Sequence, residues 1–174
     1  MRCDSDFVSR DPEFTSLADT IMQSILNSAG SSPVTHQSRF SSDKNIEEKI
    51  CYYRTKFREN IGIESSHLIE VEPSKSQAIG HYIHQRLGNN TGKIGSLVKV
   101  ESEYITNPSS LEEIGNYLSR QIVALSDPEV NVAKLLNSEY LFAPIGTVRK
   151  FIEQYEEKLK CKIAVLDMAY VKIK

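Results

Sequence analysis

The side chains that could do chemistry in this sequence include three cysteines and four histidines. Nucleophilic catalysis needs a thiol or hydroxyl beside a base, and a zinc site needs cysteines or histidines at ligand spacing. Cys3, Cys51 and Cys161 lie far apart, and no histidine stands at ligand spacing from any of them. We therefore expect free thiols in a reducing compartment, no metal site, no cofactor and no enzymatic activity.

The alternative from another functional class is an enzyme that uses Cys3, Asp6, His81 or His84. The spacing of these four residues provides neither a base next to a nucleophile nor a set of metal ligands. A metal titration that detects no bound ion would weaken this alternative further.

Two short segments carry most of the information. Arg2–Asp11 sets the carboxylate of Asp6 beside the aromatic ring of Phe7, just ahead of a predicted helix. The second segment runs from Gly80 to His84 and continues, after a short loop, from Gly92 to Val98 as a predicted hairpin. An aromatic side chain at the edge of a fold suits insertion into a partner better than chemistry, so the expected partner is another protein.

Composition excludes several classes of function. The chain has 174 residues and a net charge of −2, which gives no general attraction to nucleic acid or to an acidic membrane. No stretch reaches the roughly 20 apolar residues that span a bilayer. Met1 leads directly into polar residues, so no signal or transit peptide is expected. No glycine-rich phosphate loop or dinucleotide-binding fingerprint is present.

Apolar periodicity predicts two helices in the first part of the chain. Asp11-Pro12-Glu13 is typical of a helix start. The predicted apolar stripe that follows comprises Phe14, Leu17, Ala18, Ile21, Met22, Ile25 and Leu26. Residues 28–43 form a serine-rich linker. The second helix carries Ile46, Ile50, Tyr53 and Phe57 on one face.

Strands and two more helices are predicted in the rest of the chain. The strands are expected at 67–72, 79–85, 93–101 and 162–173, with a hairpin turn at 86–92. Ser110-Leu111-Glu112-Glu113 predicts a capping box at one helix start, and Thr147 predicts a cap for the last helix. Blocks of helices and antiparallel strands indicate an α+β fold of two small lobes, residues 1–73 and 74–174.

These segments resemble motifs of the elongation factor Ts family. Cys3–Asp11 is similar to the family's Cys-x-Thr-Asp-Phe-Val-Ala-Lys/Arg-Asp, with Ser5 in place of Thr. Arg58–Ile61 resembles Gly-Glu-Asn-Ile, with Arg58 in place of Gly. Gly80–His84 with Lys93-Ile94-Gly95 resembles the hairpin Gly-Ser-Tyr-x-His-Gly…Arg-Ile-Gly, with a longer turn. The motifs at 140–144 and 147–148 resemble Pro-Phe-x-x-x-Pro…Thr-Val, so the resemblance covers nearly the whole chain.

Three departures from the family pattern refine the expectation. Members usually begin with a small helical domain and a strand hairpin, so this chain resembles an amino-terminally truncated member. A coiled-coil insertion of many bacterial members is absent between Pro128 and Asn137, as in mitochondrial members. Several motif positions are substituted. Together these features favour a mitochondrial location, with a bacterial cytoplasm or a plastid as alternatives.

The resemblance implies a guanine-nucleotide exchange factor that releases GDP from elongation factor Tu during translation. It implies no direct contact with nucleic acid or membrane. The implied release wedge is Phe7, held in register by Asp6, while Arg10 is a candidate contact at the rim. The further implied partner contacts are His84, Phe57, Arg58, Tyr140, Leu141 and Phe142.

Each of these residues also has a structural interpretation. Phe7 could pack in the core against Phe14, Asp6 could serve only the turn into the helix, and His84 could be a structural residue of its strand. Phe57 lies on an apolar stripe, which favours packing, and the aromatic cluster that begins at Tyr140 is typical of a core. The alternative for the whole protein is an exchange-inactive protein that keeps the fold and binds the GTPase or serves a structural role.

Overall fold

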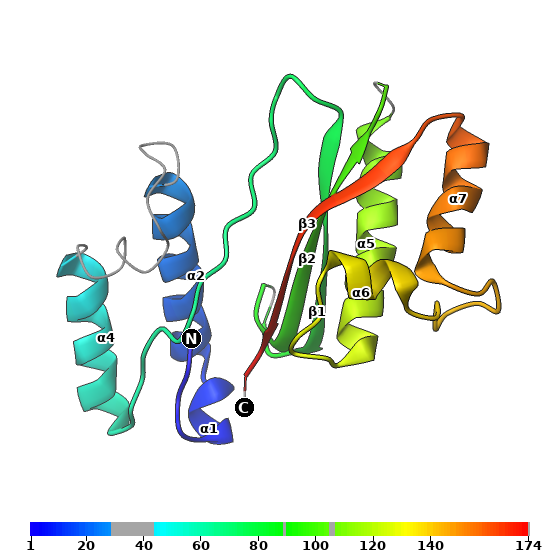
Figure 1. Ribbon diagram of the computed structural model, residues 1–174. Helices are drawn as coiled ribbons and strands as arrows, with labels where there is room; N and C mark the ends of the chain where they lie inside the picture. Colours follow the sequence, from blue (N-terminus) through cyan, green and yellow to red (C-terminus); the bar gives the residue numbers. More distant parts are fainter. Residues whose placement is uncertain (29–43, 89, 105–106, 174) are drawn as a thin grey trace. The chain divides into compact units, whose positions relative to one another are not determined.

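The computed structural model describes residues 1–28, 44–88, 90–104 and 107–173. It is an α+β fold with helices and a three-stranded sheet (Figure 1). The chain divides into two compact units. The first contains residues 1–68, the hairpin turn 85–93 and residue 173, and the second contains 69–84 and 94–172. The division predicted after residue 73 stays a prediction. Of the linker predicted at 28–43, Ser28 is instead the last residue of a helix, and residues 29–43 lie outside the described residues.

In the described residues, three helices build the first unit. They are α1 (Asp6–Ser9), α2 (Pro12–Ser28) and α4 (Lys44–Phe57). The predicted start of α2 is confirmed, because the Asp11 carboxylate accepts a hydrogen bond from the Glu13 N–H at 2.7 Å. The apolar faces of the helices enclose a small core of Val8, Phe14, Leu17, Ile21, Ile46, Ile50 and Ile61.

Expectations for residues 1–72 need correction. Met22 and Leu26, predicted on the buried stripe of α2, are each 49% exposed because they lie to one side of the face that meets the core. The four-residue helix α1 was not predicted. Residues 67–72 form no strand, because no neighbouring strand in the described part of the chain pairs with their backbone.

The second unit contains most of the sheet. Its strands are β1 (Gln77–Arg86), β2 (Gly92–Ser102) and β3 (Ile163–Lys172), in the order β1-β2-β3. The predicted hairpin is confirmed, and β3 runs antiparallel to β2 with a register shift between Lys99 and Val100. The side chains of Val98 and Val100 are fully buried, while their neighbours along β2 are half-buried.

Three helices pack in the second unit: α5 (Pro108–Leu125), α6 (Val132–Asn137) and α7 (Val148–Leu159). The predicted inward residues of α5 and α7 are confirmed, and these core residues include Leu111, Ile114, Leu118, Ile122, Val148, Phe151 and Ile152. The Thr147 hydroxyl accepts from the Lys150 N–H, as predicted for a cap. Helix α6 was not predicted.

The predicted capping box of α5 is wrong. Asn107 caps the helix instead, because its side-chain oxygen accepts from the Ser109 N–H at 3.1 Å. Pro108 occupies the first turn, where its fixed φ suits a helix and its missing N–H has no partner to lose. The helix therefore begins before Ser110, which lies inside it.

Two glycines allow β1 and α5 to approach closely. A Cβ atom on Gly80 would lie 1.8 Å from the carbonyl carbon of Gly115, a distance that no side chain can tolerate. Gly80 opens the motif that the sequence singled out, and its first role is therefore packing. Among the described residues, no helix is long and apolar enough to cross a membrane.

Candidate functional site

Helix α1 presents an aromatic ring to solvent. Its residue Val8 is buried in the first core, whereas its neighbour Phe7 is 83% exposed. Packing of Phe7 against Phe14, the structural interpretation open from the sequence, is therefore wrong within this chain. A ring that does not contribute to the core is available to a partner.

The carboxylate of Asp6 is held by Lys93, near the start of β2. The Lys93 ammonium lies 2.6 Å from Asp6 Oδ1, and both residues belong to the first unit. The hydrogen bond and positive charge of Lys93 lower the pKa of Asp6, so the carboxylate stays ionised. This ion pair joins the two segments that the sequence singled out.

Glu59 fixes the chain just before α1. Its Oε2 accepts hydrogen bonds from the backbone N–H groups of Asp4 at 3.2 Å and Ser5 at 3.1 Å, and its Oε1 accepts from the Ser5 hydroxyl. The same hydroxyl oxygen accepts from the Val8 N–H at 3.2 Å and so caps α1. In return, the Asp4 carboxylate accepts from the Asn60 N–H at 3.1 Å.

Backbone pairing extends this attachment on both sides. Arg2 and Gly62 form an isolated antiparallel bridge through hydrogen bonds of 2.8 and 3.1 Å. Arg54 on α4 donates from Nε to the Ile61 carbonyl at 2.5 Å. Burial and the nearby Glu59 raise the pKa of the Cys3 thiol, which makes this cysteine a poor nucleophile.

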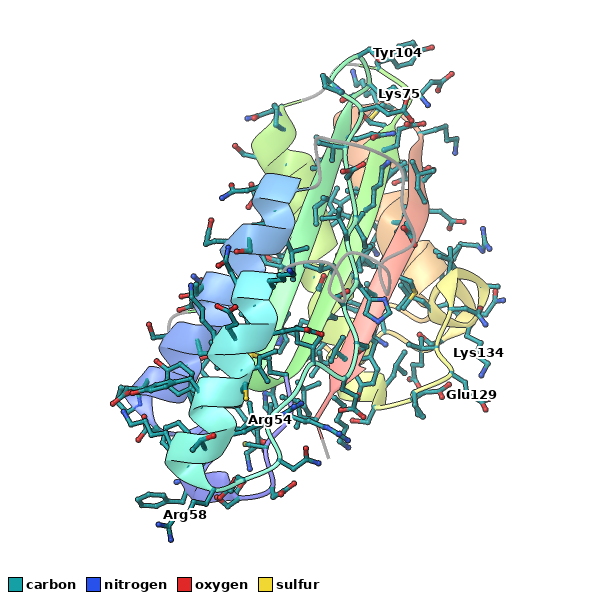
Figure 2. All side chains as sticks on the ribbon, turned by 90° about the vertical axis from the view of Figure 1, so that its left-hand side faces the viewer. Arg54, Arg58, Lys75, Tyr104, Glu129 and Lys134 are labelled. Atoms are coloured by element: carbon teal, nitrogen blue, oxygen red, sulfur yellow. The ribbon has the colours of Figure 1, made fainter. Side chains whose placement is uncertain are left out.

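Two other predicted contact residues follow α4. Phe57 is half-buried and stacks on Tyr53 with ring centroids 5.9 Å apart, which agrees with its interpretation as a packing residue. Arg58 is exposed and projects away from the end of the helix (Figure 2). Its φ of 56° lies in the left-handed region that favours glycine.

His84 lies on β1 in the second unit. Its side chain is exposed, and its ring stacks on that of Tyr82 at a centroid distance of 6.2 Å. Gln85, the next residue, has a φ of 52°. An exposed imidazole can donate a hydrogen bond to a partner or accept one from it.

The predicted aromatic cluster in the second unit separates into core and surface. Tyr140 is 6% exposed and stacks on Phe151 at 4.4 Å. Leu141 is 51% exposed, and Phe142 is 39% exposed with the Arg120 guanidinium 4.2 Å from its ring centroid. Leu141 and Phe142 are therefore candidates for partner contact, whereas Tyr140 supports them from the core.

A buried amide holds this surface loop. Gln121 is fully buried on α5, and its Oε1 accepts from the Leu141 N–H at 3.0 Å. Its Nε2 donates to the Glu139 carbonyl at 2.7 Å. The backbone that carries Leu141 is thus fixed from both sides by one side chain.

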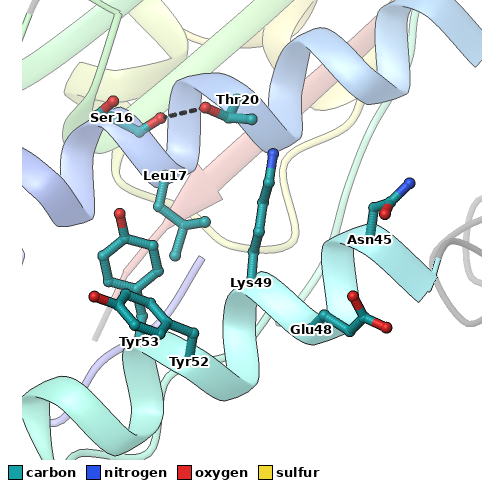
Figure 3. Close-up of a pocket in the computed structure, with 8 residues that line it drawn as sticks. All are labelled: Ser16, Leu17, Thr20, Asn45, Glu48, Lys49, Tyr52 and Tyr53. Atoms are coloured by element: carbon teal, nitrogen blue, oxygen red, sulfur yellow. Dashed lines mark hydrogen bonds between the residues drawn. The ribbon is translucent and has the colours of Figure 1, made fainter.

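A groove of about 480 Å³ lies between α2 and α4 (Figure 3). Ser16, Leu17 and Thr20 line it from α2, and Lys49, Tyr52 and Tyr53 are among the residues that line it from α4. The Thr20 hydroxyl donates to the Ser16 carbonyl at 2.9 Å, so it serves its own helix. In the part of the chain that the structure describes, no group of three or more histidine, cysteine or acidic residues could hold a metal ion.

Comparison with known proteins decides the family. The family model described as Elongation factor TS matches residues 4–143. The chain belongs to the elongation factor Ts family. The matched residues include α1, the Glu59 attachment, the hairpin and the loop at Leu141.

The relatives found include bacterial and mitochondrial members. The chain is 26% identical over 187 residues to the elongation factor Ts of Lawsonia intracellularis, covering 98% of this chain and 62% of the relative. It is 29% identical over 183 residues to that of Neorickettsia sennetsu, covering 96% and 60%. The mitochondrial elongation factor Ts of Heterostelium pallidum is 32% identical over 111 residues, which are 59% of this chain and 31% of the relative. The chain thus spans about 60% of the length of the first two curated relatives.

The elongation factor Ts motifs bear on two of the non-glycine residues that have positive φ. Arg58 and Gln85 stand where the family motifs quoted above have glycine, and both have positive φ. Both residues thus have the left-handed conformation that glycine adopts without steric cost.

Sequence reasoning missed the two residues that position the exposed groups. Glu59 belongs to the Gly-Glu-Asn-Ile motif, and this membership could have drawn attention to it. Gln121 has no comparable signal except that it is a polar residue close to the apolar face of α5. Lys93 was quoted as part of a motif, but its pairing with Asp6 depends on the fold.

Proposed function

We propose that this chain is a guanine-nucleotide exchange factor that promotes GDP release from elongation factor Tu during translation elongation. The observation that carries the proposal is the exposed ring of Phe7 on α1, a helix anchored by the burial of Val8 and by Glu59. Membership in the elongation factor Ts family supports elongation factor Tu as the partner. The proposed activity makes and breaks no covalent bond.

Exchange of this kind is a competition between two ligands of one GTPase. If the factor lowers the affinity for GDP by some ratio, GDP lowers the affinity for the factor by the same ratio. The factor must therefore make contacts that exist only when the nucleotide site is distorted. In our proposal, Phe7 makes such a contact by inserting between helices of the GTPase.

The burial of one phenyl ring can supply a useful share of this energy. Removing an exposed phenylalanine side chain from water is worth about 1.5–3 kcal/mol. This gain would offset the displacement of the elements that hold Mg²⁺ and the phosphates of GDP. Loss of the metal ion would then weaken the charged phosphate site further.

The other exposed groups have supporting roles in the proposal. Asp6 accepts hydrogen bonds beside the wedge, since a carboxylate can only accept. Arg58 and His84 add polar contacts, and Leu141 and Phe142 add an apolar contact on the second unit. Phe57 and Tyr140 act from within the fold, because each packs against an aromatic neighbour.

The test is the release of a fluorescent GDP from a cognate elongation factor Tu, with and without the chain. We expect the chain to accelerate release in proportion to its concentration until the GTPase is saturated. An unchanged release rate in the presence of folded chain would refute exchange activity. A mitochondrial location stays a prediction, with a bacterial cytoplasm or a plastid as alternatives.

A second candidate is a protein that binds the GTPase without accelerating release. It is favoured by the coverage of about 60% of the first two relatives, since residues outside that match could be needed for exchange. In that case the chain would bind elongation factor Tu in a pull-down or titration, while GDP would dissociate at its intrinsic rate.

A further inference from the structure

We propose that Glu59 is the positioning residue of the exchange site: its carboxylate sets the orientation in which α1 presents Phe7. This inference rests on the proposed function and adds to it a residue that is not itself expected to touch the partner. The reasons lie in the hydrogen bonds before α1, in the shortness of α1 and in the exposure of Phe7.

The carboxylate of Glu59 accepts three hydrogen bonds from two consecutive residues. The donors are the N–H of Asp4, the N–H of Ser5 and the hydroxyl of Ser5. Hydrogen bonds to an ionised acceptor are roughly twice as strong as those between neutral groups. Both oxygens of Glu59 are used, so the segment is fixed in direction as well as in place.

Helix α1 is too short to hold a fixed orientation without contacts to the rest of the unit. It has only four residues, far fewer than the roughly 12–15 at which an isolated helix becomes even marginally stable. Its first turn is closed by the Ser5 hydroxyl, which accepts from the Val8 N–H while it donates to Glu59. A single serine thus connects the carboxylate to the turn that carries Phe7.

Phe7 has no contact in the core that could hold its ring in place, since 83% of it is exposed. The direction of the ring therefore follows the backbone of α1. Val8 anchors one side of the helix, and Lys93 holds Asp6. Glu59 is the attachment that acts through the start of the helix, and its loss would let the ring take several directions.

This role makes a prediction that simple destabilisation does not make. A wedge that is present but poorly oriented still binds, yet it distorts the nucleotide site less often. Replacing Glu59 by Ala should therefore lower the maximal rate of GDP release at saturating chain by about tenfold, because small misplacements of an acting group can cost up to about 100-fold. The concentration of chain for half-maximal release should change much less.

The decisive experiment combines Glu59→Ala with Phe7→Ala and measures release of fluorescent GDP over a range of chain concentrations. We expect Glu59→Ala to lower the maximal rate in the otherwise unchanged chain and to have no further effect once Phe7 is removed. Glu59→Gln, which keeps one acceptor oxygen, should restore part of the rate. It also carries the test if the alanine variant does not fold.

Glu156 provides a matched control. Like Glu59, it accepts a hydrogen bond from a backbone N–H, in this case that of Ile163 at 2.8 Å. Its carboxylate also accepts from the Lys162 ammonium at 2.7 Å. It belongs to the second unit, whereas α1 belongs to the first. Glu156→Ala should lower the melting temperature without changing the maximal rate of release.

The outcomes separate the two claims. If the unaltered chain does not accelerate release, the proposed function fails and the role of Glu59 falls with it. If the unaltered chain is active but Glu59→Ala matches it at saturation, only the positioning role is refuted. The same holds if Glu59→Ala reduces the rate by an equal factor with and without Phe7.

Discussion

The Ser5 hydroxyl donates to the Glu59 carboxylate and accepts from the Val8 N–H, although Ser5 and Glu59 lie 54 residues apart in the sequence. This relationship connects the two motifs in the first half of the chain. It also explains why a four-residue helix can present an exposed aromatic ring in a fixed direction. Hydrogen bonds of the chain around α1 hold the ring in this position, and packing of the ring itself does not.

Gly80→Ala should strongly destabilise the second unit. The added methyl group would meet the backbone of Gly115 at 1.8 Å, and a backbone atom cannot move aside as a side-chain tip can. We expect a loss of about 3 kcal/mol in the free energy of unfolding, at the upper end for overpacking. Urea denaturation measures this loss.

Gly95→Ala is the matched control on β2, since its nearest atom within reach is the Tyr82 carbonyl oxygen at 4.0 Å. Its added methyl group would meet no close atom, so Gly95→Ala should not destabilise the fold and should change stability by at most about 1 kcal/mol. Similar stabilities for the two variants would show that β1 and α5 are not in close contact.

Arg58→Gly should stabilise the first unit. Arg58 has a φ of 56°, where a side chain costs about 1–2 kcal/mol and glycine avoids most of this cost. After the entropy of glycine is included, we expect a gain of about 0.5–1 kcal/mol in the free energy of unfolding.

Glu48→Gly, in the middle of α4, is the opposite control and should cost roughly 0.5–1 kcal/mol. Weaker binding of Arg58→Gly to elongation factor Tu, despite its higher stability, would support a contact through the arginine side chain. A loss of stability in Arg58→Gly would contradict the strained backbone.

The ion pair of Asp6 with Lys93 should be visible in a titration. Lys93 lowers the pKa of Asp6, so Lys93→Gln should raise that pKa toward its ordinary value. A carboxylate with a lowered pKa in the folded state stabilises the fold above its ordinary pKa, and this contribution disappears as the pH falls through the lowered value. Carboxyl NMR resonances of Asp6 measure the shift.

Asp127 serves as the internal reference in the same spectra. Its pKa is also lowered, by the Glu129 N–H and by Lys134, and none of these residues belongs to the first unit. Its titration should be the same in both proteins. An Asp6 titration that does not respond to Lys93→Gln would show that the pair does not form in solution.

The alanine variants of Tyr140 and Leu141 should differ in stability and in binding to the partner. Tyr140→Ala removes a core ring stacked on Phe151, so we expect a loss of about 3–5 kcal/mol. Leu141→Ala removes an exposed side chain and should change stability by less than about 0.5 kcal/mol.

Binding to elongation factor Tu provides the second measurement. If Leu141 is a partner contact, its alanine variant should bind more weakly while its melting temperature stays unchanged. Unchanged affinity would remove Leu141 from the proposed surface. The Tyr140 variant is informative only at temperatures where it remains folded.

The sequence predicted the helices and strands that have a clear apolar periodicity or a clear turn signal. The stripes of α4, α5 and α7 placed Ile50, Ile114 and Phe151 in the core, and the turn before Lys93 predicted the hairpin. These elements are long, and their apolar period is set by geometry alone. The α+β fold followed from their order.

The failures have physical causes. A strand needs a neighbour, and the alternating pattern at 67–72 indicates only a half-buried chain. Helices α1 and α6 are too short for a periodic signal and depend on tertiary contacts. The cap of α5 moved to Asn107 because Pro108 favours an earlier start.

The motif singles out Asp6 and Phe7 as candidates, and their roles stay predictions. The attachments by Glu59, Lys93 and Gln121 could not be predicted, because they depend on side-chain geometry across long sequence separations. Burial also differs between neighbouring residues of similar type, since Tyr140 is buried and Phe142 is exposed.

The central claim concerns Phe7, and the rate of GDP release at saturating Phe7→Ala tests it most directly. The account predicts a maximal rate about 10–100-fold lower, since burial of the ring is worth about 1.5–3 kcal/mol, with a smaller change in affinity and an unchanged melting temperature. Met22→Ala, another exposed apolar residue of the first unit, should release GDP like the unaltered chain. Equal losses of rate and affinity in Phe7→Ala would make the ring a simple anchor, and an unchanged maximal rate would contradict the account.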